Sequence, residues 1–259
     1  MPQFLVIPPA RRPAAVGDVL VLADGEARHL KTVLRTDPGV ELALTDGRGF
    51  RYTGRLVTVG KGDPTVEILT VMQDETEARL PLLAVALGVV KGRRFEWALE
   101  KACELGAHRI LPLRTEFGVV EPGGNKQERW QTILASALKQ CGRCVMPQLA
   151  APEGLAAVLE DAAAEVWYGA SPAAERTRAA GWDPADPEAP VGSGLPGEIL
   201  VCIGPEGGWS TGEMDMLRRS GARPLDLGPH VLRTETAVAA SLAVLQRRRQ
   251  RLQAVARGA

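Results

Sequence analysis

No part of the chain is apolar enough to suggest a membrane-spanning helix. Such a helix requires roughly 18 or more consecutive apolar residues, and the apolar runs among these 259 residues are all shorter. Residues 1–9 have no basic flank and no long apolar stretch, so a signal peptide is not predicted. We therefore expect a cytoplasmic protein without a membrane partner.

Cysteine is scarce as well, with four residues in the whole chain. Cys103 and Cys202 lie within apolar patterns and are typical of small core residues. Cys141 and Cys144 form a C-x-x-C pair, but a zinc site usually needs two more ligands at matching spacing, and none is near. The sequence favours incidental thiols over a redox or metal site, and we expect no metal.

The chain also carries no net charge. The charges are nevertheless unevenly distributed, because basic stretches at 91–147 and 218–259 flank an acidic stretch at 148–217. A basic stretch suits a phosphate-backbone partner, whereas solvated helix faces account for the same charges without one. Charge alone does not decide between these two interpretations.

Short strand patterns with Asp-Gly turn signals between them fill the first 73 residues. Alternating apolar residues predict strands at 19–22, 40–44, 52–59 and 65–71. One helical pattern interrupts them at 26–35. Regular strands joined by tight turns are typical of a small β-barrel, so we predict a barrel domain over 1–73 and a linker at 73–79.

After the linker, strand patterns alternate with helical ones. Apolar runs predict strands at 82–90, 109–113, 165–168, 199–203 and 224–227. Helical periodicity predicts helices at 95–105, 128–141, 156–164, 213–219 and 235–256. This alternation indicates a mostly parallel α/β sheet over 74–259. Residues 171–198, rich in proline, glycine and alanine, are predicted to form a surface insertion.

Glycines gather at the end of the strand predicted at 199–203. Gly204, Gly207 and Gly208 surround Pro205 and Glu206 there. Ligands of open α/β sheets bind at the carboxyl edge of the strands, and glycine lets backbone groups approach a ligand closely. A phosphate loop is not indicated, because no Lys-Ser or Lys-Thr pair follows. The whole unit favours a ligand-binding turn over a plain strand-to-helix connection.

A second cluster leads into the last predicted helix. Leu227 and Gly228 follow a strand, and the segment 232–237, Leu-Arg-Thr-Glu-Thr-Ala, opens the helix. Thr234 and Glu235 suit the cap and first turn of that helix. Capping does not explain Arg233, whose guanidinium offers five fixed donors to a phosphate, a carboxylate or a base carbonyl.

The two clusters, in this order and spacing, resemble the cofactor loops of SPOUT-class methyltransferases. That class ties the C-terminal part of its sheet into a trefoil knot, which holds a bent S-adenosylmethionine. More closely, the chain is similar to the family of ribosomal RNA small subunit methyltransferase E, which methylates N3 of a uridine in 16S ribosomal RNA. The resemblance extends over nearly the whole chain and is also carried by His29-Leu30, Val33-Leu34-Arg35, Glu100-Lys101, Glu104-Leu105-Gly106-Ala107, Ile110, Pro112, Thr115, Lys139-Gln140, Gly142-Arg143 and Pro147. It implies a PUA-like, RNA-binding barrel followed by a knotted α/β domain.

The sequence departs from the family pattern at several positions. The family usually has Glu where Lys139 stands and Ser where Cys141 stands, and it often has Arg where His230 stands. The stretch Glu116-Phe117-Gly118 replaces the more usual Arg-Ser pair, and the insertion at 171–198 has no clear counterpart. The changes at 139 and 116–118 bear on RNA contacts, while the cofactor assignment is unaffected.

The resemblance implies three sets of site residues. The expected cofactor contacts are Ile203, Gly204, Pro205, Gly207, Gly208, Leu227, Gly228, Leu232, Thr234 and Ala237, with Tyr168-Gly169-Ala170 as a further wall. Uridine N3 carries a proton at neutral pH, for which Glu206 and Glu235 are candidate bases and His230 a weaker one. Arg233 is expected to hold uracil oxygens or a phosphate. The basic groups expected to contact RNA are Arg11, Arg12, Arg28, His29, Lys31, Arg35, Arg93, Arg94 and Arg143.

Two alternatives stay open. Another SPOUT enzyme would methylate a different RNA position or a ribose 2′-hydroxyl, and the cofactor loops alone do not separate these. A non-enzymatic RNA-binding protein would rely on the barrel and would have no affinity for S-adenosylmethionine. The resemblance further implies a homodimer, with 16S ribosomal RNA or the small ribosomal subunit as the partner.

Overall fold

The computed structural model describes residues 3–7, 12–23, 26, 30, 37–59, 63–75, 77, 79–118, 125–160, 164–170 and 195–258. The chain divides into two compact units. The barrel unit comprises Met1–Ala78 and Ala135–Met146, and the sheet unit comprises Arg79–Leu134 and Pro147–Ala259. Residues 135–146, placed in the second domain by the sequence pattern, thus group with the barrel.

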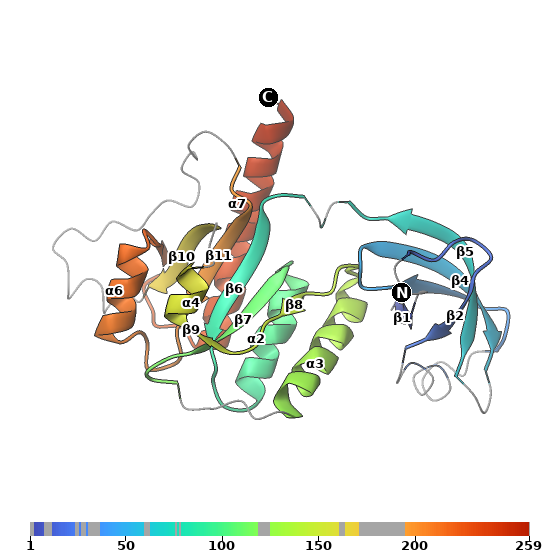
Figure 1. Cartoon of the computed structure of the whole chain (residues 1–259), viewed down its shortest axis with the longest axis horizontal. Helices are drawn as coiled ribbons and strands as arrows, with labels where there is room; N and C mark the ends of the chain where they lie inside the picture. Colours follow the sequence, from blue (N-terminus) through green and yellow to red (C-terminus); the bar gives the residue numbers. More distant parts are fainter. Residues whose placement is uncertain are drawn as a thin grey trace. The chain divides into compact units, whose positions relative to one another are not determined.

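Five strands of the barrel unit close into a barrel (Figure 1). They are β1 (Phe4–Ile7), β2 (Val19–Leu22), β3 (Glu41–Thr45), β4 (Phe50–Thr58) and β5 (Thr65–Gln73). Their order is β1-β2-β5-β4-β3, with β1 parallel to β3 and the other pairs antiparallel. Alternate side chains such as Leu20, Leu22 and Leu44 point into one buried core. The predicted barrel is confirmed, whereas the predicted helix at 26–35 lies outside the described residues except for Glu26 and Leu30.

Residues 135–146 bring the end of helix α3 (Asn125–Cys141) into the barrel unit. Lys139 forms an ion pair with the buried carboxylate of Glu26. Gln3 Nε2 donates a hydrogen bond to the carbonyl of Leu138 at 3.3 Å. These partners are more than a hundred residues apart in sequence, so helical periodicity alone carries no information about this grouping.

Cys144 lies beside two carboxylates of the same unit. Its Sγ and the oxygens of Asp74 and Glu77 lie within 4.8 Å of one another. Both carboxylates have cationic partners, because Arg51 donates to Asp74 at 2.9 Å and Arg143 donates to Glu77 at 2.7 Å. Burial, together with the charge of Glu77, raises the pKa of Cys144 to about 12. The group is therefore a salt-bridge network around a thiol that is protonated at neutral pH.

The sheet unit is built on parallel strands with helices between them. The strands are β6 (Leu82–Gly88), β7 (Arg109–Arg114), β8 (Gln148–Leu149), β9 (Glu153–Gly154), β10 (Ala164–Ala170), β11 (Glu198–Ile203) and β12 (Arg223–Asp226). The helices, besides α3, are α2 (Arg93–Glu104), α4 (Leu155–Glu160), α6 (Thr211–Arg219) and α7 (Thr234–Gly258). The strand order is β12-β10-β11-β6-β7-β8, with β9 beside β7, and each of these pairings is parallel. The predicted mostly parallel α/β sheet is confirmed.

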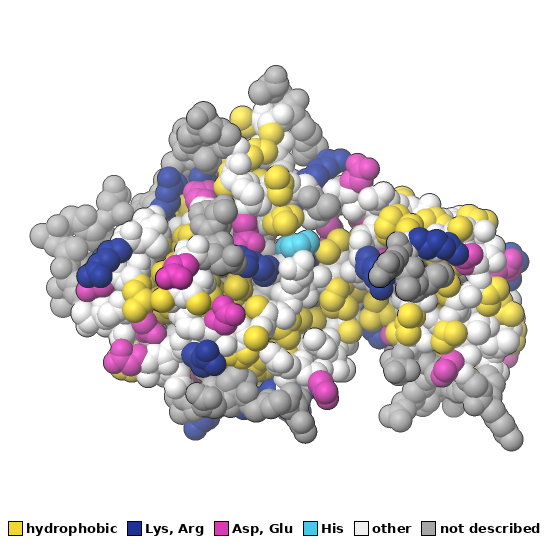
Figure 2. All heavy atoms as spheres, in the orientation of Figure 1, with side chains coloured by type: hydrophobic (Ala, Val, Ile, Leu, Met, Phe, Trp, Pro, Cys, Tyr) yellow, Lys and Arg dark blue, Asp and Glu magenta, His cyan; other side chains and the backbone are white. Residues whose placement is uncertain are grey.

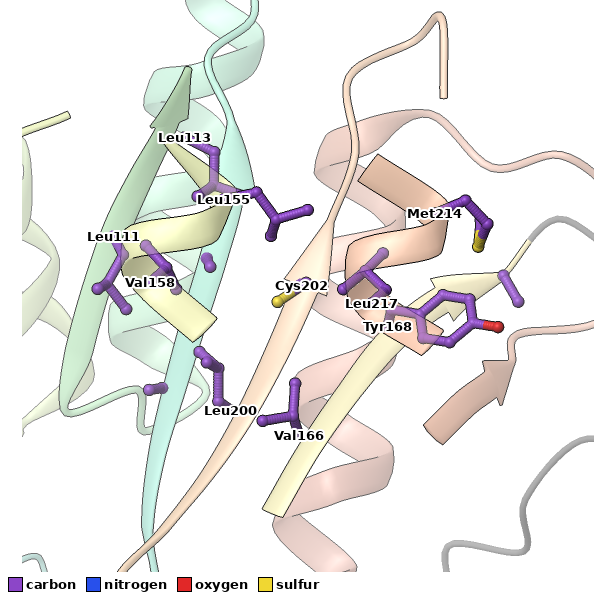
Figure 3. Packing of buried hydrophobic residues seen from close by; sticks show 13 residues of the cluster. Leu111, Leu113, Leu155, Val158, Val166, Tyr168, Leu200, Cys202, Met214 and Leu217 are labelled. Carbon is purple, nitrogen blue, oxygen red and sulfur yellow. The ribbon is translucent and has the colours of Figure 1, made fainter. Parts of the chain in front are cut away.

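Helices cover both faces of the sheet. Figure 3 shows Leu155 and Val158 of α4 and Met214 and Leu217 of α6 packed over the strands. Helix α7 packs against β6 and β11, and α2 packs against α7. On α2 the predicted apolar face is buried. Burial on both faces explains why β6 and β11 are nearly continuous apolar runs.

Three sequence expectations concern regions beyond these elements. Residues 171–194 of the predicted insertion lie outside the described part of the chain. The trefoil knot implied by the family resemblance stays a prediction. Within the described ranges, no helix is long and apolar enough to cross a membrane.

Candidate active site

A cavity of about 560 Å³ opens beside the carboxyl ends of β10 and β11. This is the edge at which open parallel sheets bind their ligands. Of the predicted cofactor residues, Ile203, Gly204, Pro205, Gly207, Gly208, Leu227, Leu232, Thr234 and Ala237 line it. The two glycine-containing clusters, separated by about twenty residues in sequence, thus form one cavity.

The turn after β11 is shaped by close backbone packing. A Cβ at Gly88, the last residue of β6, would lie 2.8 Å from both the N and the Cδ of Pro205. Gly208 has a φ of 74° and donates its N–H to the carbonyl of Pro205 at 2.8 Å. Only glycine adopts that conformation without strain. The turn is consequently held against the neighbouring strand with its backbone facing the cavity.

The second cluster is tied directly to this turn. Thr234 Oγ1 donates a hydrogen bond to the carbonyl of Gly204 at 3.2 Å. The N–H of Ala237 donates to the carbonyl of Arg233 at 2.8 Å, which begins the hydrogen-bonding pattern of α7. Thr234 is only 3% exposed. Its hydroxyl is therefore committed to joining the two clusters at the first turn of α7.

Strand β10 supplies the third wall. Gly169 and Ala170 line the cavity, as expected from the sequence, whereas Tyr168 packs in the core on the α4 and α6 side. A Cβ at Gly169 would lie 2.8 Å from Cδ1 of Ile203. The glycine therefore makes room for the apolar side chain that lines the cavity from β11.

Four cavity residues were not predicted from the sequence: Phe117, Trp209, Met214 and Val231. Trp209 follows directly on the glycine turn and packs against Gly204, so its place next to Gly208 was a usable signal. Phe117 comes from the segment after β7, far away in sequence. Only the three-dimensional packing brings this segment to the cavity.

The candidate catalytic residues differ in their position. Glu206 and His230 line the cavity and are exposed. Glu206 forms an ion pair with Arg94 of α2. Arg233 is exposed, and neither it nor Glu235 is among the lining residues, although both adjoin residues that are. One carboxylate oxygen of Glu235 is buried without a hydrogen-bond partner among the described residues.

Gly228, the remaining predicted cofactor residue, does not line the cavity. Its N–H donates to Oδ1 of Asp226 at 2.8 Å, and its φ is 105°. A glycine is needed here for the turn that follows β12. Gly228 thus shapes the segment that carries Leu227 into the cavity.

The predicted RNA contacts fall into three groups. Arg11, Arg28, His29, Lys31 and Arg35 lie outside the described residues. Arg12 pairs with Asp18 at 2.9 Å, and Arg143, only 11% exposed, pairs with Glu77. Arg93 and Arg94 are exposed at the first turn of α2. On the face of the sheet unit visible in Figure 2, basic side chains lie among acidic ones and form no single basic patch.

The thiol of Cys202 is close to the cavity in sequence but does not face it. Cys202 is the neighbour of Ile203 on β11, and its side chain is fully buried on the opposite face, in the core. Burial raises the pKa of Cys202 to about 12. The thiol therefore stays protonated at neutral pH and is not a nucleophile. The groups that do face the cavity are apolar side chains, backbone amides and carbonyls, the carboxylate of Glu206 and the imidazole of His230.

Two family models match the chain. One, described as an RNA methyltransferase domain, matches residues 76–246, and the other, an RNA methyltransferase PUA domain, matches residues 22–69. Ribosomal RNA small subunit methyltransferase E of Synechocystis is 31% identical over 86% of this chain and 71% of its own length. The protein of that name from Bacillus subtilis is 28% identical over 82% of this chain and 83% of its own length.

Solved structures give the same result. Ribosomal RNA small subunit methyltransferase E from Neisseria gonorrhoeae, bound to S-adenosyl methionine, is 29% identical with a TM-score of 0.77 and covers 95% of this chain and 97% of its own. A putative methyltransferase from Legionella pneumophila, also bound to this cofactor, is 30% identical with a TM-score of 0.79 and covers 95% and 98%. The chain therefore belongs to the RNA methyltransferase family, in the group of the ribosomal RNA small subunit methyltransferase E proteins.

Proposed function

We propose that the protein transfers the methyl group of S-adenosylmethionine to N3 of a uridine in 16S ribosomal RNA. The observation that carries the proposal is the single cavity formed by the turn 204–208 and the segment 232–237, joined by the hydrogen bond from Thr234 to Gly204. The relatives called ribosomal RNA small subunit methyltransferase E supply the substrate, since that name specifies small-subunit ribosomal RNA. Two similar solved structures hold the cofactor.

The cavity suits an adenosyl cofactor. Its walls are mainly apolar, with Ile203, Leu227 and Leu232 from three different segments. An adenine ring needs such an apolar slot and a few backbone hydrogen bonds, which the turn at 204–208 can provide. A nucleotide phosphate would instead require a basic or glycine-rich cradle of another pattern. Ile203, Gly204, Leu227, Leu232 and Ala237 would hold the cofactor.

The chemistry required of the protein is mainly positioning and proton transfer. The bound cofactor supplies a methyl group already activated by its sulfonium. The uracil N3–H must lose its proton, which a nearby carboxylate or imidazole accepts. Glu206 and His230 face the cavity and are therefore better placed than Glu235. We assign Arg233 to the uracil oxygens or the target phosphate, where its fixed donors stabilise the anionic ring.

The remaining parts of the proposal concern the wider assembly. The barrel unit would hold the RNA through Arg11, Arg12, Arg28, His29 and Arg35, and the sheet unit would add Arg93 and Arg94. Arg143, which belongs to the barrel unit, would add to the first group. Phosphate contacts of this kind orient the nucleic acid and leave the choice of base to the cavity. We further propose a cytoplasmic homodimer acting on 16S ribosomal RNA or on the small ribosomal subunit, without a metal.

The proposal is tested with small subunits from a bacterial strain that lacks the corresponding methyltransferase gene. The purified protein and S-adenosylmethionine are added, and nucleosides of the 16S RNA are identified by mass spectrometry. We expect new N3-methyluridine. Methylation at another position or at a ribose 2′-hydroxyl would assign a different SPOUT reaction. Lack of S-adenosylhomocysteine binding in calorimetry would leave a non-enzymatic RNA-binding protein.

A further inference from the structure

Phe117 is a large aromatic side chain left exposed at the cavity. It belongs to the turn 115–118 that follows β7, lines the cavity, and is 45% exposed. A single exposed apolar residue is ordinary on a protein surface. At the rim of a ligand cavity, however, an exposed ring has a flat face available to whatever enters.

The side chain rests on the glycine turn. A Cβ at Gly207 would lie 2.8 Å from Cβ of Phe117 and 3.3 Å from its Cγ. A side chain at position 207 would force Phe117 or the turn to shift, because real Cβ atoms do not approach so closely. One part of Phe117 is thus packed against the turn that lines the cavity, while 45% of the residue stays open to solvent.

The backbone under Phe117 is fixed as well. The N–H of Glu116 donates to Oε1 of Glu213 at 2.9 Å, and the N–H of Ser210 donates to Oε2 of the same carboxylate at 2.9 Å. Gly118 closes the turn by donating its N–H to the carbonyl of Thr115 at 2.9 Å. Glu213 is only 7% exposed and caps α6 in a capping box. The ring is therefore presented from a preorganised support, which reduces the entropic cost of binding to it.

Charged residues lie on the same cavity and on the segments next to its lining residues. Arg94 and Glu206 form an exposed ion pair, and Glu206 lines the same cavity as Phe117. Arg114 and Arg233 are exposed on the segments that lead to Phe117 and to Thr234. An exposed aromatic face with arginines near it is the combination that binds unpaired nucleobases, through stacking and phosphate contacts together.

We propose that Phe117 is the stacking platform for an unpaired base of the RNA substrate as that base enters the cavity. The proposal rests on the proposed function, because it takes the cavity to be the site of methyl transfer. It adds a substrate-contacting residue whose contribution comes from its π-face. The other possible role for Phe117, a mere apolar wall for the cofactor, predicts different measurements.

The experiment compares Phe117→Ala, Phe117→Leu and Phe117→Trp in the full chain. We expect Ala and Leu to raise KM for RNA by about 5- to 150-fold, the range of one lost base stack, and Trp to preserve it. The Kd for S-adenosylhomocysteine, from calorimetry, stays unchanged in all three. Trp97→Leu is the matched control, because Trp97 is an aromatic residue with a similar exposure, 42%, and is not among the residues that line the cavity.

Two results would overturn the proposal. If Phe117→Leu has the same KM for RNA as the wild type, the aromatic face of Phe117 does not stack on a base. If the variants weaken S-adenosylhomocysteine binding and leave KM for RNA unchanged, Phe117 is a wall of the cofactor site. Failure of the proposed function looks different, since the wild-type protein would then methylate no uridine. In that case, fluorescence anisotropy with a short single-stranded RNA still tests stacking: equal Kd values for wild type and Phe117→Leu reject it.

Discussion

The hydroxyl of Thr234 donates to the carbonyl of Gly204 at 3.2 Å, across 30 residues of sequence. This bond links the first turn of α7 to the turn that ends β11. Each segment alone resembles an ordinary connection between a strand and a helix. Together they enclose one cavity, and the bond between them supplies the buried hydroxyl of Thr234 with a hydrogen-bond partner.

Replacing Thr234 with valine removes this link while keeping the shape of the side chain. A lost hydrogen bond of this kind costs about 1 kcal/mol, so we expect the Kd for S-adenosylhomocysteine to rise roughly fivefold. Thr234→Ser retains the hydroxyl and should bind nearly as the wild type does. Thr236→Val, at an exposed position two residues later, is the control. Equal affinity of Thr234→Val and wild type in calorimetry would contradict the role assigned to the bond.

Gly88→Ala tests the packing of the turn 204–208 against β6. The added Cβ would lie 2.8 Å from the backbone N of Pro205, so the turn must move. Overpacking of this type costs about 1–3 kcal/mol. We expect a lower Tm in calorimetry together with weaker S-adenosylhomocysteine binding. Gly154→Ala is the control, because a Cβ there meets nothing within 4 Å, and it should change neither value.

Much of the sheet unit follows from the sequence because its strands are buried on both faces. Runs such as Leu82–Gly88 and Glu198–Ile203 are too apolar to be anything but core elements. The turn 204–208 was also predictable, since glycines directly after a buried strand indicate a backbone that is approached closely by a neighbour or a ligand. Element ends were less certain: residue 164, the predicted end of this helix, is the first residue of β10, since an alanine-rich pattern does not mark a helix end.

The rest depends on contacts between distant segments. Nothing local in 115–118 indicates that Phe117 reaches the turn at Gly207, because a carboxylate of α6 holds that segment in place. The assignment of 135–146 to the barrel unit likewise rests on pairs such as Lys139 with Glu26. Charge counts along the sequence did not reveal that Arg143 forms an ion pair with Glu77 within the barrel unit.

Glu213→Gln tests the support beneath Phe117. The amide of glutamine has a single acceptor oxygen, so it cannot accept from both Glu116 and Ser210 without placing an NH₂ group against an N–H. We expect a loss of about 1–2 kcal/mol in urea unfolding and a raised KM for RNA. Asp215→Asn on the same helix, where the carboxylate is half exposed, is the control. Unchanged stability and KM in Glu213→Gln would show that the carboxylate is dispensable.

Cys202 should make the protein sensitive to alkali. Its folded-state pKa, about 12, is above the ordinary value of 9.0, so the unfolded chain releases this proton first. The stabilising contribution is complete below pH 9 and is lost as the pH rises toward 12. We expect the stability difference between wild type and Cys202→Ala, measured by urea unfolding, to shrink by about 2 kcal/mol between roughly pH 8 and 10.5. A difference that stays constant over this range would contradict the assignment.

Arg94 and Glu206 form an exposed ion pair at the cavity, and two matched variants separate its possible roles. Exposed pairs contribute little to stability, so Arg94→Gln and Glu206→Gln should both leave Tm unchanged. Either variant breaks the pair, but only Arg94→Gln removes a cation. If Arg94 contacts an RNA phosphate, that variant alone lowers the slope of log Kd against log salt by about 1. If Glu206 is the base, Glu206→Gln alone lowers kcat while RNA affinity is kept. Equal losses in both variants would mean that the pair acts only by holding the turn 204–208, and would remove Arg94 from the RNA contacts.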